Sequence, residues 1–295
     1  MTEPIIRCEN ITHFYGERLI YENLNFQVEK GKILGLLGKN GTGKTTIINI
    51  LNGYLKPYSG NCYLFGENID VLKPETKSRI GLLLEGHVQH NYFNVVQIEK
   101  FYRQFYSNWK SEPYWELMNR MKVTKTQKLA TMSCGQRSQV ALGLILAQDP
   151  ELLILDDFSM GLDPGYRRIF VDYLKEYVIA ENKTVFLTSH IIQDMEDLID
   201  ETMIMDYGKL MLHLPTNEIL NNFKRFTFNA IDITPLMNTE HIYNPELLKG
   251  TGICYSFLPD PEVKALLQSK GYCIEGLQSE KLNLEDAFIG LTGKY

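Results

Sequence analysis

A glycine-rich loop between an apolar strand and an amphipathic helix limits what this chain can fold into more than any other feature. The segment 35–47 contains G-x-x-x-x-G-K-[ST], running from Gly38 to Thr45. Its glycines let successive backbone N–H groups point inward at phosphate oxygens, and the following helix adds the positive end of its dipole. A chance match in a glycine-bearing turn is the competing explanation. The apolar run 32–37 before the loop and the apolar positions in 45–55 after it argue against chance.

The loop predicts a site for ATP or GTP with Mg²⁺. Lys44 is expected to reach the β- and γ-phosphates, and the Thr45 hydroxyl is expected to hold Mg²⁺. The predicted nucleotide-binding residues of the loop are Gly38, Lys39, Asn40, Gly41, Thr42, Gly43, Lys44, Thr45 and Thr46.

Short β-rich runs alternate with helical segments along the first two thirds of the chain, which predicts an α/β fold with a parallel sheet. The 295 residues are 44% hydrophobic and 22% charged, ordinary for a globular core. Apolar and aromatic residues recur at helical spacing between Tyr92 and Met121, which indicates a helical insertion. The predicted strands are 5–8, 24–28, 32–37, 61–65, 80–84, 152–155, 184–188 and 202–205, and the predicted helices include 45–55, 133–148 and 166–178.

A carboxylate follows the most apolar of these strands. Residues 152–155 are four aliphatic side chains, and Asp156 comes directly after them. A phosphate-binding loop needs a carboxylate at the end of a neighbouring strand to support Mg²⁺. A loop residue or helix cap is the alternative for Asp156 alone, but together with the loop the magnesium role is preferred.

Together with further motifs, the loop and Asp156 make residues 4–213 resemble the ATP-binding subunit of an ABC transporter of the bacterial exporter type. Residues 132–137 (MSCGQR) are similar to the family's LSGGQ signature, and 160–164 (MGLDP) to the segment after the magnesium strand. Residues 188–191 put His190 at the family's switch histidine, and Tyr15 matches its adenine-stacking aromatic. The resemblance implies a P-loop NTPase of the ABC ATPase type, with a mixed sheet core and a helical subdomain.

The resemblance also implies roles for residues outside the loop. His190 would hydrogen-bond the γ-phosphate, and Asp163 would belong to the nucleotide-binding set. Ser133, Gly135 and Gln136 would face the γ-phosphate of ATP held by a second cassette, so that two cassettes close head to tail as a homodimer or heterodimer. The alternatives are a plain helix cap at Ser133, a structural histidine at position 190 and a core aromatic at position 15.

Three positions depart from the family pattern. Asp157 stands where the family has the glutamate that orients or deprotonates the attacking water. Its shorter reach predicts slow hydrolysis, or a subunit that binds ATP with little turnover. Glu85 replaces a glutamine and could accept a Mg²⁺-bound water, although a solvent-exposed loop acid is an equal alternative. Cys134 replaces the first signature glycine, and binding is expected to survive that change.

The expected domains are an ATP-binding domain at 1–213, with its helical subdomain at about 86–148, and a small α/β appendage at 214–295. In the appendage we expect strands at 226–230, 254–257 and 273–277, with helices at 261–270 and 284–291. The resemblance implies that the chain powers transport of an unknown substrate through separate membrane-spanning subunits, docked on the helical subdomain.

The chain shows neither a signal peptide nor an apolar run long enough to span a membrane. The resemblance implies a cytoplasmic chain that is peripheral on the inner face of the cell membrane. Its net charge of −6 argues against nucleic acid as a partner. A soluble ABC ATPase acting on ribosomes or DNA is a competing class, but the chain has no basic face or second cassette. Five scattered cysteines fit a reducing compartment.

Overall fold

The structure is a computed structural model that describes residues 3–84, 90–159 and 161–293. The chain folds into two compact units, Met1–Leu210 and Met211–Tyr295.

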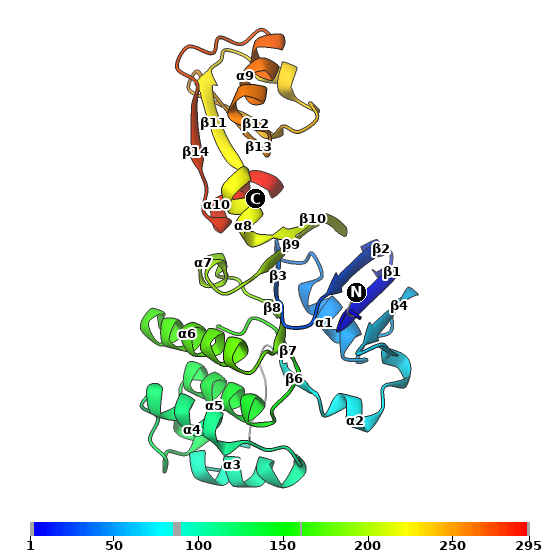
Figure 1. The fold of residues 1–295 in the computed structure, drawn as a ribbon, viewed down its shortest axis with the longest axis vertical. Helices are drawn as coiled ribbons and strands as arrows, with labels where there is room; N and C mark the ends of the chain where they lie inside the picture. The colour runs from blue at the N-terminus through cyan, green and yellow to red at the C-terminus, as the bar shows by residue number, and fades with distance from the viewer. Residues whose placement is uncertain (1–2, 85–89, 160, 294–295) are drawn as a thin grey trace. The chain divides into compact units, whose positions relative to one another are not determined.

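The first unit is built on a sheet whose central strands are parallel (Figure 1). Every residue of the two strands 152–155 and 184–188 is buried, and their side chains are mostly branched aliphatics. Strands that are covered on both faces are typical of parallel sheets. The α/β prediction is therefore confirmed. The strand order is β10 (Lys209–Pro215), β9 (Glu201–Asp206), β3 (Ile33–Gly38), β8 (Thr184–Thr188), β7 (Leu152–Leu155) and β6 (Ile80–Leu83).

The first unit also contains a second, antiparallel sheet. Its order is β2 (Arg18–Val28), β1 (Ile6–Tyr15), β4 (Ser59–Leu64) and β5 (Glu67–Asn68). The helix α1 (Lys44–Leu51) contributes Ile47, Ile48 and Leu51 to a core shared with both sheets. It ends before the predicted residue 55, because Gly53 adopts a left-handed φ of 70°.

Helices account for much of the remainder of the first unit (Figure 1). The predicted helices between Tyr92 and Met121 are present, and Tyr114 is fully buried among them. The Tyr114 hydroxyl donates to the Val95 carbonyl at 2.7 Å. A Cβ on Gly143 would lie 2.9 Å from the Tyr114 ring, so the helices approach closely there. The helices are α2 (Pro74–Lys77), α3 (Val95–Tyr102), α4 (Ser111–Arg120), α5 (Cys134–Ala147), α6 (Pro164–Ala180) and α7 (Ile192–Glu196).

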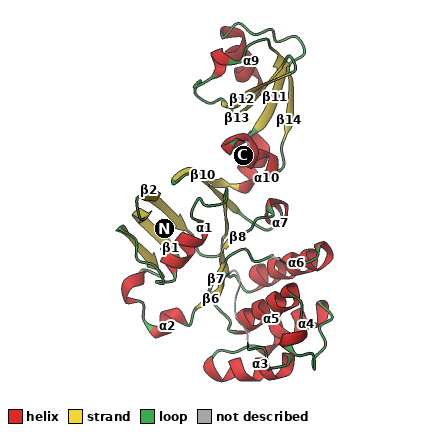
Figure 2. Cartoon of the chain, turned by 180° about the vertical axis from the view of Figure 1, so that it is seen from behind, coloured by secondary structure: helices red, strands yellow, loops and turns green. Residues whose placement is uncertain are grey.

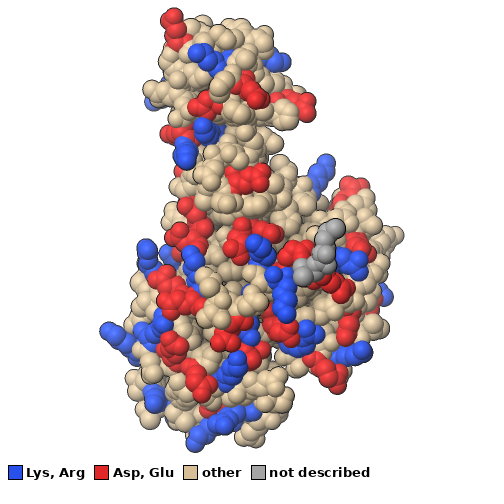
Figure 3. Space-filling model, in the orientation of Figure 1, with Lys and Arg blue, Asp and Glu red and all other residues tan. Residues whose placement is uncertain are grey.

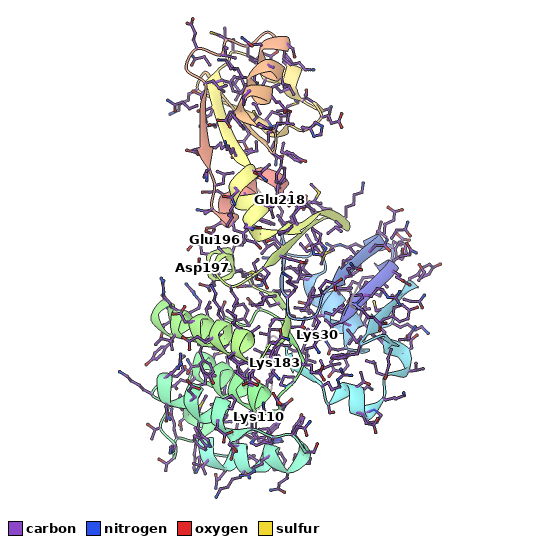
Figure 4. The ribbon with its side chains drawn as sticks, viewed as in Figure 1. Lys30, Lys110, Lys183, Glu196, Asp197 and Glu218 are labelled. Carbon is purple, nitrogen blue, oxygen red and sulfur yellow. The ribbon has the colours of Figure 1, made fainter. Side chains whose placement is uncertain are left out.

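Ion pairs join the start of α4 to the loops after α5 and α6 (Figure 4). Lys110 Nζ lies 3.1 Å from both Asp149 and Glu181, and Lys183 Nζ lies 2.6 Å from Asp149. Lys183 is mostly buried, so its pair with Asp149 is less screened by water than an exposed pair. These contacts connect the start of α4 to the two loops that lead into β7 and β8.

The second unit has an antiparallel sheet with helices packed around it (Figure 2). Its core includes Phe226, Phe228, Cys254, Val263 and Leu267. The sheet order is β12 (Tyr243–Leu248), β13 (Thr251–Ser256), β11 (Lys224–Asn229) and β14 (Gln278–Lys281), and the helices are α8 (Thr216–Asn222), α9 (Asp260–Ser269) and α10 (Leu284–Thr292).

One predicted strand of this unit is wrong. Residues 273–277 are irregular, and the strand β14 begins only at Gln278. Gly276 has a φ of 85°, and the Leu277 N–H donates to the Ile274 carbonyl at 3.1 Å, which closes a turn. The apolar residues of 273–277 pack on the core of the unit from this turn rather than from a sheet.

Among the described residues, short 3₁₀ turns lie at Ile69–Val71, Arg103–Phe105, Leu129–Thr131 and Thr234–Leu236.

Candidate nucleotide-binding site

A cavity of about 290 Å³ opens in the first unit at the carboxyl ends of β3, β7 and β8. The sheet order places β8 between β3 and β7, so the loops that follow these three parallel strands meet at one edge. Ligands of open α/β sheets bind at this edge. The cavity is lined by Tyr15, Arg18, Ile20, Asn40, Gly41, Gly43, Lys44, Thr45, Thr46, Asp156, Thr188, Ser189 and His190.

The glycine-rich loop forms one wall of this cavity. Gly41 and Gly43 have φ values of 78° and 105°, which only glycine adopts readily. A Cβ on Gly43 would lie 2.5 Å from the Tyr21 hydroxyl, which donates a hydrogen bond to the Gly43 carbonyl. The loop is therefore curled tightly around its own backbone, as a phosphate cradle requires.

Lys44 supplies the positive charge of the loop. Its Nζ donates to the carbonyls of Gly38 and Lys39 at 2.6 and 3.1 Å, so the ammonium lies at the mouth of the loop. Burial lowers the pKa of Lys44, and the nearby carboxylates of Asp156 and Asp157 act in the opposite direction. An ammonium at this position is suited to charge-assisted hydrogen bonds with phosphate oxygens.

Asp156 and Asp157 follow β7 and are both buried. Thr188, the last residue of β8, connects them: its hydroxyl donates to Asp156 Oδ1 at 2.7 Å and accepts from the Asp157 N–H at 2.9 Å. Among the described residues, Asp156 Oδ2 has no hydrogen-bond partner although it is buried. A buried carboxylate oxygen beside Thr45, in a cavity that also holds Lys44, fits the donor set of a hard cation such as Mg²⁺.

Asp157 and His190 are brought together across the ends of β7 and β8. The His190 N–H donates to Asp157 Oδ1 at 3.1 Å, and His190 Nε2 lies 3.6 Å from Asp157 Oδ2. The His190 side chain is about half exposed, at 49%, and lines the cavity, whereas that of Asp157 is 6% exposed. His190 is therefore no purely structural histidine of the core.

Tyr15 lies at the rim of the cavity. It is 51% exposed, so the alternative of a core aromatic is wrong. Its hydroxyl is 3.5 Å from the Thr46 hydroxyl, and its ring makes a T-shaped contact with the His13 ring at a centroid distance of 5.0 Å. An exposed ring face beside the phosphate loop is available for stacking.

The signature-like residues lie outside this cavity, at the start of α5. The Ser133 hydroxyl accepts from the Gln136 N–H at 3.1 Å, and the Gln136 side chain accepts from the Ser133 N–H at 3.1 Å. This is a capping box, so the helix-cap interpretation of Ser133 is correct as local geometry. A Cβ on Gly135 would lie 2.4 Å from the Gly161 carbonyl. Asp163 is exposed at the start of α6.

Glu85 lies outside the described residues. The structure also adds cavity residues that the sequence alone did not single out for binding: Arg18, Ile20, Thr188 and Ser189. Arg18 reaches the loop from β2, where its guanidinium donates to the Gly41 carbonyl at 2.9 Å. Thr188 ends the buried strand β8 and Ser189 follows it, but nothing in the sequence shows that this strand lies between β3 and β7.

Comparison with known proteins identifies the family. A family model described as ABC transporter matches residues 21–159. The bacitracin transport ATP-binding protein BcrA of Bacillus licheniformis is 32% identical over 98% of this chain and 97% of its own length. The Nod factor export ATP-binding protein I of Ralstonia nicotianae is 27% identical over 99% of this chain and 94% of its own.

The fold is also that of solved cassettes. The dimeric, post-hydrolysis structure of the ATP-binding cassette MJ0796 bound to ADP and Pi superposes with a TM-score of 0.63 at 21% identity, covering 72% of this chain and 98% of that one. Within the part of the chain that the structure describes, no helix has both the length and the apolar character needed to cross a bilayer. The chain belongs to the ABC transporter family, as an ATP-binding subunit that hydrolyses ATP to power transport.

Proposed function

We propose that this chain hydrolyses Mg²⁺-bound ATP at the cavity described above, with Asp157 orienting or deprotonating the attacking water. The contact between Asp157 and His190 carries this proposal. It places a buried carboxylate and a half-exposed imidazole side by side at the end of the sheet where Lys44 also lies. In this proposal His190 hydrogen-bonds the γ-phosphate, and its contact with Asp157 holds both side chains in place.

Thr45 and Asp156 would hold Mg²⁺ in this site. The support is the buried, unpartnered Asp156 Oδ2, together with the presence of Thr45 in the lining of the same cavity. Mg²⁺ held by these residues would supply positive charge next to the transferring phosphoryl group. Glu85 is proposed to accept a water of the ion.

The nucleotide itself would lie along the loop 38–46, with adenine stacked on Tyr15. The exposed ring of Tyr15 and its approach to Thr46 support this placement. Aromatic stacking at an exposed rim favours a flat, apolar base over water.

A second cassette would complete the site. We propose that Ser133, Gly135, Gln136 and Asp163 face the nucleotide of a partner chain, in a homodimer or a heterodimer. Their position away from the cavity of their own chain supports this arrangement, since the start of α5 presents N–H groups suited to an anion. The similar cassette MJ0796 is described as a dimer.

The output of hydrolysis would be export through separate membrane-spanning subunits. One similar protein is named for Nod factor export and another for bacitracin transport, which supports an export role with an unknown substrate. We place the chain at the inner face of the cell membrane, with residues 1–213 as the ATP-binding domain, about 86–148 as the docking subdomain and 214–295 as an accessory domain. Nucleic acid is not proposed as a partner, because acidic and basic residues are interspersed on the face shown in Figure 3.

A turnover assay tests the hydrolysis proposal. The purified chain should release phosphate from ATP only with Mg²⁺, and Asp156→Asn should abolish that release. Asp157→Glu extends the carboxylate by one bond, about 1.5 Å. Because a shift of about 1 Å can change a rate on the order of a hundredfold, this variant should turn over faster than the native chain. An unchanged rate in Asp157→Glu refutes the role of Asp157.

A pull-down tests the transport assembly. The chain, tagged and expressed in a cell that makes its neighbouring membrane proteins, should recover a multispanning membrane protein. Recovery of ribosomes or DNA in its place would refute the transporter partners while leaving the ATPase result intact.

A further inference from the structure

Thr188 is the last residue of β8 and lies between the two acids of the site. It pairs with Leu36 of β3 on one side, and the preceding residue Leu187 pairs with Leu155 of β7 on the other. The side chain is buried, with 1% of the residue exposed, and it lines the nucleotide cavity.

The single proton of the Thr188 hydroxyl fixes the direction of its hydrogen bonds. The Asp157 N–H can only donate, so the hydroxyl accepts from it at 2.9 Å. The hydroxyl proton is then directed to Asp156 Oδ1 at 2.7 Å, a distance typical of a strong bond to an ionised carboxylate. Thr188 is therefore a bridge with one acceptor and one donor contact, each to a different acid residue.

This bridge leaves the two oxygens of Asp156 unequal. Oδ1 is tied to Thr188, whereas Oδ2 is buried and has no hydrogen-bond partner among the residues that the structure describes. The bridge also holds the backbone of Asp157, whose φ of 44° is left-handed and uncommon for a residue other than glycine. One hydroxyl thus fixes both the Asp156 carboxylate, which lines the cavity, and the backbone N–H of Asp157.

We propose that Thr188 is a positioning residue that orients Asp156 so that Oδ2 is presented to the divalent cation of the nucleotide. This rests on the proposed magnesium role of Asp156. Groups that hydrogen-bond a metal-binding carboxylate commonly change metal affinity by about 10- to 100-fold when they are lost. Thr188 acts on the cation through its hydrogen bond to Asp156.

Thr184, at the other end of the same strand, provides a matched control. It is also fully buried, and its hydroxyl accepts a hydrogen bond from the Gly31 N–H at 2.9 Å. The two threonines are four positions apart along the strand, roughly 13 Å. Thr184→Val removes a buried, hydrogen-bonded hydroxyl from β8 without changing the acids.

The experiment compares nucleotide binding with and without Mg²⁺ in the full-length chain. Binding of a fluorescent ATP analogue is titrated with Mg²⁺, and separately measured in EDTA, for the native chain, Thr188→Val, Thr188→Ser and Thr184→Val. We expect Thr188→Val to raise the Mg²⁺ concentration for half-maximal effect by about tenfold. Its affinity in EDTA should stay within about twofold, because the phosphate loop is unchanged.

The two control variants separate positioning from packing. Thr188→Ser keeps the hydroxyl and should restore the native Mg²⁺ dependence, whereas Thr184→Val should lower the melting temperature and leave the Mg²⁺ dependence unchanged. If Thr188→Val does not fold, Thr188→Ala removes the same hydroxyl with less volume and is judged by the same criteria.

Three results overturn the proposal: a native Mg²⁺ dependence in Thr188→Val or Thr188→Ala, no rescue by Thr188→Ser, or an equal shift in Thr184→Val. If the native chain binds the analogue equally well with and without Mg²⁺, the magnesium role of Asp156 fails and this proposal fails with it. If the native chain needs Mg²⁺ and Thr188→Val behaves identically, only the role of Thr188 is refuted.

Discussion

The backbone N–H of His190 donates a hydrogen bond to the Oδ1 atom of Asp157, and the imidazole of the same histidine lies beside Oδ2. The two residues follow different strands, β8 and β7, which pair in parallel. A change at either residue therefore acts on a shared arrangement rather than on one isolated side chain.

Removing the imidazole tests that arrangement. His190→Ala keeps the backbone hydrogen bond to Asp157 but loses the ring that we propose to contact the γ-phosphate. We expect ATP affinity to change little, while the hydrolysis rate falls by about 10²- to 10³-fold, the range for loss of one hydrogen-bond donor to the charge that develops in the transition state. Steady-state phosphate release and calorimetric titration of ATP check the two quantities. His213→Ala, in β10 and outside the cavity lining, serves as the comparison. A rate within twofold of native in His190→Ala contradicts the expectation.

Lys44→Ala should abolish binding of Mg²⁺-ATP. The ammonium is the cation held at the mouth of the loop by the carbonyls of Gly38 and Lys39, and alanine leaves that position without a charge. Calorimetry of the native chain should give a clear heat of binding, and Lys44→Ala should give none. Lys56→Ala removes an exposed lysine whose pair with Asp70 is 3.7 Å long, and it should bind as the native chain does. Equal heat from native and Lys44→Ala proteins refutes the phosphate-loop assignment.

Tyr21→Phe should remove a hydrogen bond that holds the backbone of the phosphate loop at Gly43. Tyr21 is fully buried, and its hydroxyl donates to the carbonyl of Gly43, which also accepts from the Ile47 N–H. Because the carbonyl keeps that second bond, we expect the free energy of unfolding to fall by about 1 kcal/mol, together with a several-fold loss of nucleotide affinity. Urea denaturation and ATP titration measure these. Tyr58→Phe changes a residue that is 78% exposed and should leave both quantities at their native values.

Thiol labelling tests the burial of the five cysteines. Cys134 and Cys273 are exposed, whereas Cys8, Cys62 and Cys254 are buried. Burial raises the pKa of Cys254 to about 12 and also raises that of Cys8, so these thiols remain protonated at pH 8 and unreactive. A chromogenic disulfide should therefore label two thiols rapidly in the native chain at pH 8 and all five in denaturant. Cys134→Ser should reduce the rapid fraction to one, and rapid labelling of three or more in the native chain contradicts the structure.

The parallel sheet was predictable because its strands are buried on both faces. Residues 152–155 and 184–188 are runs of apolar or β-branched side chains, and both strands have the predicted bounds. The predicted strand 273–277 has a similar apolar content but lies in a turn closed by Gly276. Apolar side chains indicate that a segment packs on a core, but they do not indicate whether it pairs with another strand. For this reason the predicted strand was placed at 273–277, before the observed start of β14 at Gln278.

The site was predictable where its chemistry lies within one stretch of chain. The loop 38–46 carries strand, glycines, lysine and helix in sequence, and it forms a wall of the cavity. Arg18 and Thr188 were missed because they reach the cavity only through the β1–β2 hairpin and the order β3-β8-β7. Sequence spacing gives no account of which strand lies beside which, so the bridge between Asp156 and Asp157 becomes visible only in three dimensions.

The close approach of Gly135 to the Gly161 carbonyl has a mechanical meaning. Even a methyl group at position 135 would clash with the Gly161 carbonyl oxygen, so the first turn of α5 packs directly against the backbone that follows Asp157. If α5 serves the nucleotide of a neighbouring cassette while Asp157 serves its own, a displacement at one nucleotide is felt at the other within a single chain. Hydrolysis at one nucleotide of the two cassettes would then be coupled mechanically to hydrolysis at the other.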